Sequence, residues 1–249
     1  MATPRHRKES VMTFAFTPPL SPSVAIRDSA DRFPVHRIYC VGRNYAAHAR
    51  EMGADPSREP PFFFCKPADA VWPADVPVGA DDTPLLPYAS ATANLHHEIE
   101  LVVAIGKAGR DIPAELAHQH IFGYALGLDM TRRDLQTKLK DKGHPWEVGK
   151  AFDHSAPISS ITPSAQCGHP VSGRLWLKVN DQLTQQGDLA DMIWSVPEII
   201  QHLSVYFVLQ PGDLIFTGTP EGVGPLKVGD VLAGGVEGIA EIRLVISAA

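Results

Sequence analysis

The sequence has few cysteines, no excess of basic residues and no long apolar run, and each shortage excludes a class of protein. The three cysteines, Cys40, Cys65 and Cys167, are far apart and form no C-x-x-C pair, which argues against a disulfide framework and a thiolate zinc site. The 22 Lys and Arg against 28 Asp and Glu give a net charge of −6, which does not favour nucleic acid or an anionic membrane as partner. No apolar run approaches the roughly 18 residues that a membrane-spanning helix needs.

The N-terminal residues do not have the pattern of a secretory signal. Residues 1–11, MATPRHRKESV, are basic and polar and contain no apolar stretch of the secretory type. Met12 offers a second start site, which would make residues 1–11 a disordered extension. Together with the unpaired cysteines, these features predict a reduced, cytoplasmic protein.

Short β-type runs dominate the rest of the chain, and helices are few. The runs cover residues 37–41, 61–65, 98–105, 174–180, 213–218 and 241–246. Because strands do not alternate regularly with helices, a doubly wound α/β fold is not expected. The pattern predicts a β-rich α+β domain over residues 36–249, preceded by a small N-terminal segment, residues 1–35.

Three helices have recognisable start signals. Asn44 is placed to cap a helix over residues 45–52. Thr131 and Asp134 have the spacing of a capping box before a polar helix that runs to about Asp141. Ser195 and Glu198 have the same spacing before an apolar helix over 198–209, with Pro197 in its first turn.

Two carboxylates open the apolar strand in HHEIELVVAIG, residues 96–106. Glu98 and Glu100 point to the same face of that strand, where like charges repel and resist burial. A divalent cation such as Mg²⁺ or Mn²⁺ would cancel the repulsion, with Asp129, at the end of the apolar run IFGYALGLDM, as third oxygen ligand. A solvated strand face explains the same spacing. Zincin chemistry is excluded, because Leu101 stands where H-E-x-x-H requires the second histidine.

A candidate general base lies on the short helix in GRNYAAHAREMG, residues 42–53. His48 and Glu51 are three residues apart, so they are neighbours on one helix face. A carboxylate beside an imidazole fixes its tautomer and raises its basicity, as a base that activates water requires. An exposed helix with an incidental His–Glu pair explains the spacing equally well.

Several polar residues flank these segments and are candidates for binding an anion. Lysines and arginines in such places can bind a carboxylate or stabilise an enolate, although each taken singly could be a surface charge. Residues 217–230, TGTPEGVGPLKVGD, are glycine-rich but lack the G-K-[ST] of a Walker loop. The candidates are Lys66, Arg133, Gln136, Lys150 and Thr219.

Six motifs occur in the order and spacing of the fumarylacetoacetate hydrolase family. They are YCVGRNYAAHAREMG, FFFCKPADAV, HHEIELVVAIG, YALGLDMTRRDLQ, GKAFDHSAPIS and IFTGTPEGVGPLKVGD. The chain resembles this family from about residue 36 to the C-terminus, and within it the compact acylpyruvase and fumarylpyruvate hydrolase branch. The resemblance implies a mixed β-sandwich roll and a homodimer. It also implies a magnesium or manganese ion held by Glu98, Glu100 and Asp129.

The same resemblance implies roles for the remaining candidates. His48 with Glu51 would activate water on a lid over the substrate, and Lys150 and Gln136 would face the reacting oxygens. Arg43, Lys66, Arg133 and Thr219 match motif positions around the substrate. The implied reaction is hydrolysis of the C–C bond of an acylpyruvate whose 2-oxo acid end binds the metal. Because three carboxylates outweigh a 2+ ion, nearby cations are needed before an anionic substrate can bind.

The motif GKAFDHSAPI resembles that of the fumarylpyruvate hydrolases of gentisate breakdown. The expected substrate is therefore fumarylpyruvate, which is cleaved to fumarate and pyruvate in this type of aromatic catabolism. Its second carboxylate would be received by an arginine such as Arg43 or Arg133. The alternatives on the same site are a general acylpyruvase, oxaloacetate decarboxylation or tautomerisation, and isomerisation of a dienoic diacid. A protein that keeps the fold and only binds a metal or ligand is the alternative of another class.

Overall fold

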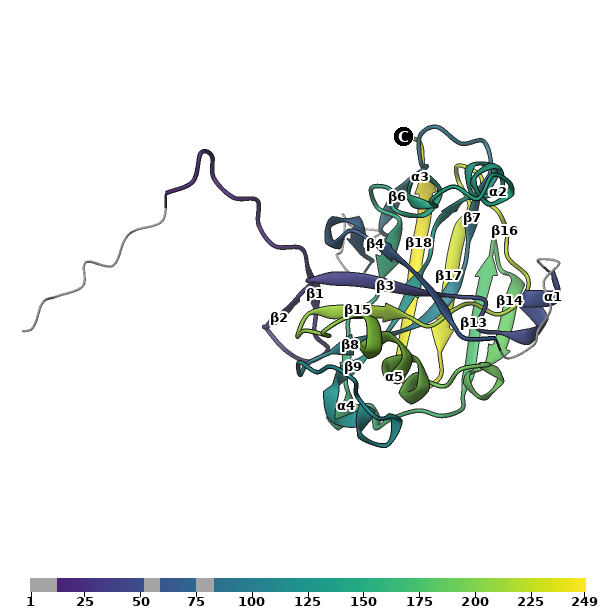
Figure 1. Ribbon diagram of the computed structural model, residues 1–249. Helices are drawn as coiled ribbons and strands as arrows, with labels where there is room; N and C mark the ends of the chain where they lie inside the picture. Colours follow the sequence, from purple (N-terminus) through teal and green to yellow (C-terminus); the bar gives the residue numbers. More distant parts are fainter. Residues whose placement is uncertain (1–12, 52–58, 75–82) are drawn as a thin grey trace, which may run out of the picture.

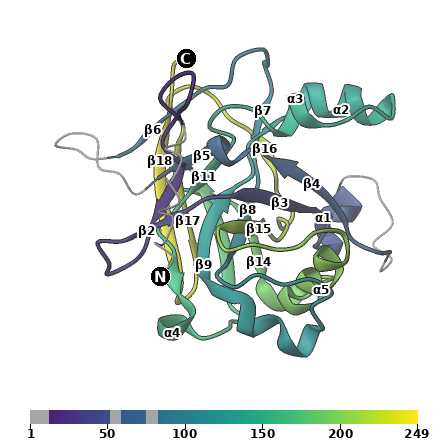
Figure 2. The ribbon, with the colours of Figure 1, turned by 60° about the vertical axis from the view of Figure 1, so that its left-hand side comes forward.

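The structure, a computed structural model, describes residues 13–51, 59–74 and 83–249, without the side chains of residues 49–51. Two large β-sheets form its body (Figures 1 and 2). The strand order is β4-β3-β15-β8-β9-β11-β5 in the larger sheet, where β12 also pairs with β9, and β14-β13-β17-β18-β6 in the smaller. Both sheets mix parallel and antiparallel pairs, so the predicted mixed, β-rich α+β fold is confirmed.

The strands of the larger sheet are β3 (Arg37–Gly42), β4 (Phe62–Lys66), β5 (Val71–Pro73), β8 (Ile99–Ile105), β9 (Ile121–Leu128), β11 (Ala156–Ile158), β12 (Thr162–Pro163) and β15 (Asp213–Phe216). Those of the smaller are β6 (Leu85–Pro87), β13 (Arg174–Val179), β14 (Gln182–Asp188), β17 (Val231–Val236) and β18 (Ala240–Ser247). Two small sheets contain β1 (Ser23–Ala25) with β2 (Arg32–Pro34), and β7 (Leu95–His97) with β10 (Thr131–Arg132) and β16 (Gly224–Pro225). The α-helices are α1 (Ala46–Glu51), α2 (Arg133–Asp141), α3 (Glu147–Lys150), α4 (Ser164–Cys167) and α5 (Val196–Tyr206).

Strand β8 separates two hydrophobic cores because its side chains alternate between the faces of the larger sheet. Leu101 and Val103 belong to the core that the two sheets share with α5. Val102 and Ala104 belong to a second core on the opposite face, which the β1–β2 hairpin covers. Glu98 and Glu100 alternate in step with Val102 and Ala104, so they point to the same face of the sheet. Their carboxylates therefore lie on the face away from the main core.

Two of the three predicted helix starts differ in the structure. Helix α2 begins at Arg133, and no side chain caps it, so the predicted capping box of Thr131 and Asp134 is wrong. Thr131 lies in β10, where it pairs with β7, and its hydroxyl donates to the carbonyl of Asp129. Asp134 accepts a hydrogen bond from the Thr92 hydroxyl instead.

Asn44 lies two residues before the first residue of α1, and its side chain makes long-range contacts. Its side-chain amide donates to the carbonyls of Trp194 and Thr217 and accepts from the Trp194 N–H, so it ties α1 to two distant segments. The third start is confirmed, because Ser195 and Glu198 form the predicted capping box at the N-terminus of α5. In Figure 1, α2 and α3 lie together at one end of the molecule, and α4 and α5 lie at the other.

The N-terminal lead-in packs on the body from β1 onward. Val24 and Phe33 are buried in the second core, and the backbone of Arg27 donates to the carbonyl of Ile161. Residues 13–22 extend away from the sheets (Figure 1). A domain boundary near residue 35 stays a prediction, and residues 1–12 lie outside the described part. No helix in the described part is long and apolar enough to cross a membrane.

Candidate metal centre and active-site cavity

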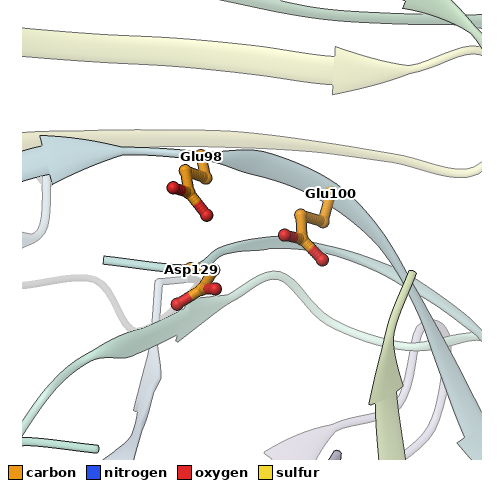
Figure 3. A group of neighbouring side chains, drawn as sticks. All are labelled: Glu98, Glu100 and Asp129. Atoms are coloured by element: carbon orange, nitrogen blue, oxygen red, sulfur yellow. The ribbon is translucent and has the colours of Figure 1, made fainter. Parts of the chain in front are cut away.

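Three buried carboxylates converge where β8 and β9 lie side by side. Glu98 directly precedes β8 and Glu100 lies within it. Both side chains point from this strand toward Asp129 (Figure 3). Asp129 follows the last residue of β9, and its N–H donates to the carbonyl of Glu98 at 2.9 Å. One oxygen from each carboxylate lies within 4.8 Å of the other two, and all three residues are at least 95% buried.

Lys150, at the end of α3, joins two of these carboxylates. Its Nζ donates to Glu98 Oε2 at 2.7 Å and to Asp129 Oδ2 at 2.6 Å. Helix α3 can bring this lysine into the site because Gly149 passes close to α2: a Cβ at Gly149 would lie 3.1 Å from the backbone of Gln136. Burial lowers the pKa of Lys150, but Asp129 and Glu98 outweigh that effect and hold the pKa above its ordinary value, so the amine is charged.

Two more cations complete the cluster. Lys66, at the end of β4, lies behind Asp129, with its Nζ 2.8 Å from Asp129 Oδ1. Arg133, in the first turn of α2, binds Glu98 Oε1 through one guanidinium nitrogen and Gln136 Oε1 through another. The three carboxylates and the three cations thus share one buried volume with a formal charge near zero.

Glu100 differs from Glu98 in its partners. Burial raises the pKa of Glu98, but Lys150 and Arg133 outweigh it and bring the pKa below its ordinary value. Burial also raises the pKa of Glu100, and the charges of Asp129 and Glu98 raise it further. Within the described part, Glu100 contacts no cation, and its hydrogen bond comes from the Gly218 N–H at 2.7 Å.

The donor set fits a hard divalent cation. Carboxylate oxygens are the ligands that Mg²⁺ and Mn²⁺ prefer, and each oxygen can accept a second interaction beside its hydrogen bond. Asp129 already pairs with Lys66 and Lys150, whereas Glu100 lacks a cationic partner in the described part. A metal ion among the three carboxylates would supply the counter-charge that Glu100 lacks.

A cavity of about 310 Å³ opens onto the cluster and gathers most of the residues singled out in the sequence. Its walls include Arg43, His48, Glu98, Glu100, Asp129, Arg133, Gln136, Lys150 and Thr219. Lys66 is not among the lining residues, since it lies behind Asp129. The side chain of Glu51 lies outside the described part, although α1 extends to this residue.

Arg43 and Thr219 are held at the cavity wall by local structure. Arg43 has a φ of 57°, an uncommon conformation for a residue with a side chain, and its guanidinium lies 5.0 Å from the centre of the Phe62 ring. The Thr219 hydroxyl donates to the carbonyl of Ile99 and accepts from the side-chain amide of Gln185. Arg43 is exposed, whereas Thr219 is buried.

Sequence reasoning missed the aromatic wall of the cavity. Phe62 and Phe64 were part of an apolar run interpreted only as a strand, yet residues two apart share a face, and here that face lines the cavity. The same period could have identified them. Other lining residues that were not anticipated are Thr137, Lys140, Asp141 and Trp146, which depend on the packing of α2 and α3.

Known proteins resemble the chain along most of its length. A structure of fumarylpyruvate hydrolase from Pseudomonas aeruginosa, in complex with Mn²⁺ and pyruvate, is 54% identical, with a TM-score of 0.91 over 95% of this chain and 100% of that one. A mouse protein named oxaloacetate tautomerase FAHD1, mitochondrial, is 46% identical over 206 residues, 83% of this chain and 89% of its own. An Arabidopsis thaliana protein of the same name is 42% identical over 207 residues, with the same coverage. The model of the fumarylacetoacetate (FAA) hydrolase C-terminal domain matches residues 37–247, and the chain belongs to this family.

Proposed function

We propose that this enzyme is a metal-dependent hydrolase that cleaves the C–C bond of an acylpyruvate, with fumarylpyruvate as substrate and fumarate and pyruvate as products. The observation that carries the proposal is the buried carboxylate cluster that opens, beside His48, into a cavity with cationic walls. The similarity to a fumarylpyruvate hydrolase bound to Mn²⁺ and pyruvate supports the same reaction.

The proposed cofactor is Mg²⁺ or Mn²⁺, held by Glu98, Glu100 and Asp129. When bound, such an ion polarises the oxygens of a 2-oxo acid and favours negative charge on them. Because the cluster is close to neutral without the ion, a divalent cation brings its formal charge to about +2. A dianionic substrate such as fumarylpyruvate would balance that charge.

The chain's own residues would carry the proton transfers. His48, oriented by Glu51, takes a proton from the water that attacks the carbonyl carbon of the fumaryl group. The C–C bond then breaks, the electron pair leaves with pyruvate as its enolate, and a proton returned to the enolate carbon completes the product. Lys150 and Gln136 stabilise the negative oxygens in this step, in a buried setting where electrostatic interactions are strong.

The remaining candidates would bind the substrate or support the site. Arg133 already binds Glu98 and Gln136, so Arg43 is the arginine that would add positive charge to the cavity wall and attract an anionic substrate. Thr219 would contact the substrate from the wall. We assign Lys66 a supporting part, because its amine lies behind Asp129. An assembly as a homodimer and a cytoplasmic location stay predictions, and the mouse and Arabidopsis relatives carry the word mitochondrial in their names.

Oxaloacetate tautomerisation is the second candidate, favoured by the names of relatives that are 42 and 46% identical. Tautomerisation moves a proton between carbon and oxygen and needs no attacking water. It should therefore depend less on His48 than hydrolysis does, which gives an experimental distinction between the two activities.

The test follows the near-ultraviolet enol absorbance of fumarylpyruvate with chelator-stripped protein, before and after addition of Mg²⁺ or Mn²⁺. We expect absorbance to fall only after metal is added, with fumarate and pyruvate as products. His48→Gln should slow this reaction roughly 100-fold or more. Exposed His144, which does not line the cavity, provides the control variant His144→Gln. Tautomerisation of oxaloacetate without cleavage of fumarylpyruvate would overturn the proposal in favour of the second candidate.

A further inference from the structure

The cavity also carries an aromatic strip formed by Phe62, Phe64 and Trp146. The Trp146 ring lies edge-on to Phe62, with ring centres 5.7 Å apart, and 5.8 Å from Phe64. All three line the cavity, and so do the carboxylates at its inner end. Aromatic faces favour stacking with a flat, conjugated group. A substrate with a polar 2-oxo acid end and a planar acyl chain would place the first at the carboxylates and the second on the aromatic strip.

One face of α2 runs from the carboxylate cluster to the cavity mouth. Arg133, Gln136 and Lys140 are spaced at i, i+3 and i+7, and all three line the cavity. Arg133 and Gln136 are buried, whereas Lys140, one turn further on, is exposed. The helix therefore presents two groups at the reacting end and a cation at the opening.

Lys140 has its charge available for a ligand. Arg133 binds Glu98 and Gln136, and Lys66 and Lys150 bind the carboxylates. Lys140 makes no ion pair or side-chain hydrogen bond with any residue in the described ranges 13–51, 59–74 and 83–249. An unpaired cation at the mouth of a site whose other lysines are neutralised attracts an anionic group.

We infer that Lys140 is a specificity-determining residue, which binds the distal carboxylate of a substrate whose planar acyl chain lies along the aromatic strip. The inference rests on the proposed function and narrows it to acylpyruvates with a conjugated chain that ends in an anion. Oxaloacetate, with its shorter chain and no conjugated acyl group, would occupy the inner end and leave both the strip and Lys140 without a partner.

The test compares two 2-oxo acids of equal length that lack the second keto group and are not cleaved. 2-Oxoheptanedioate ends in a carboxylate, and 2-oxoheptanoate ends in a methyl group. Their affinities for the Mn²⁺-loaded protein are measured by calorimetry for the wild type, Lys140→Gln, Lys140→Arg and Lys138→Gln. Lys138 lies on the same helix but does not line the cavity, so Lys138→Gln controls for the loss of a charge near the site.

We expect wild type, Lys138→Gln and Lys140→Arg to prefer the dicarboxylate about tenfold, as a hydrogen-bonded charge pair provides, and this preference should weaken as salt is added. Lys140→Gln should lose the preference. In turnover, Lys140→Gln should raise the KM for fumarylpyruvate more than the KM for acetylpyruvate, with a smaller change in kcat. An unchanged preference in Lys140→Gln, or no preference in the wild type, would overturn the inference. The calorimetric result stands even if fumarylpyruvate is not cleaved, so a failure of the proposed function is recognised separately.

Discussion

At the scale of single residues, Glu98 and Glu100 have the same chemistry and different environments. Glu98 lies between Lys150 and Arg133, whereas Glu100 has a backbone N–H and two neighbouring acids. Glu98 is thus stabilised as a carboxylate within the chain itself. Glu100 is the group whose burial is unfavourable until a cation arrives, because a buried charge needs a partner.

Replacing Glu100 by Gln should therefore separate stability from metal binding. Glu100→Gln removes the uncompensated charge, so we expect the metal-free protein to gain about 1–3 kcal/mol in its free energy of unfolding. Added Mn²⁺ should no longer stabilise the folded protein, because the variant lacks the third carboxylate ligand. Urea unfolding with and without Mn²⁺ measures both effects. Glu241→Gln, an exposed position on β18, is the control, and equal stability of metal-free Glu100→Gln and wild type would contradict the argument.

The pairing of Glu98 with Glu100 could be predicted because strand residues alternate, and their shared face is present in the structure. The cations that neutralise them were harder to assign individually. Lys66, Arg133 and Lys150 are far apart in the sequence and come together through β4, α2 and α3. Spacing alone does not tell a lysine behind a carboxylate, such as Lys66, from one at a cavity mouth, such as Lys140.

At the scale of elements, the contact between α2 and α3 positions two groups of the candidate site. A Cβ at Gly149 would lie 3.1–3.2 Å from Gln136 atoms, closer than ordinary van der Waals contact allows. Gly149→Ala should therefore push α3 from α2 and displace both Lys150 and Gln136. We expect a loss of about 1–3 kcal/mol in stability, as for other overpacked contacts.

Turnover by Gly149→Ala should fall more than stability does, roughly tenfold or more, since small displacements of catalytic groups are costly. Urea unfolding and steady-state kinetics on fumarylpyruvate measure the two effects. Val148→Ala is the matched control on the same helix, because the Val148 side chain is exposed. Normal kinetics in Gly149→Ala would show that the close approach does not position the site.

Elements whose residues follow a simple period were predictable, and those whose residues depend on a distant partner were not. The capping box of α5 is local, and it is present as predicted. Strand β14 is polar in sequence, yet Gln185 within it is fully buried and bonds to His97, Ile99 and Thr219. Strand β17 contains Gly234 and Gly235, which weaken a strand pattern.

The glycines of β17 are explained by its pairing with β13, a strand that the sequence predicts but whose neighbour in the sheet it does not reveal. A Cβ at Gly235 would lie 2.8 Å from the Trp176 indole, and one at Gly234 would lie 3.0 Å from the Trp176 carbonyl. The two glycines therefore leave room for β13. Residues that are small because a distant part of the chain packs on them follow no sequence period, so the sequence pattern does not predict them.

For the whole molecule, metal binding should appear as a shift in thermal stability. A ligand that binds only the folded state stabilises it by about 2.7 kcal/mol at 100 times its dissociation constant. For a chain of this size that corresponds to a rise of roughly 5–10 °C in Tm. We expect scanning calorimetry of chelator-stripped protein to show this rise with Mn²⁺ or Mg²⁺.

Potassium chloride at equal ionic strength is the control for the thermal measurement. Because the effect requires three carboxylate ligands, Glu100→Gln should show little of the rise. An identical Tm for the wild type with and without divalent metal would argue against a metal centre in this cluster.

The near-neutral cluster of three acids and three cations also bears on whether folding requires the metal ion. In small zinc domains the ion drives folding, because the unfilled ligands repel one another. Here Lys66, Arg133 and Lys150 already offset most of that repulsion, and they do so only after β4, α2 and α3 have packed. We therefore expect the scaffold to fold without a metal ion and to bind the proposed ion afterwards, once these three cations are in place.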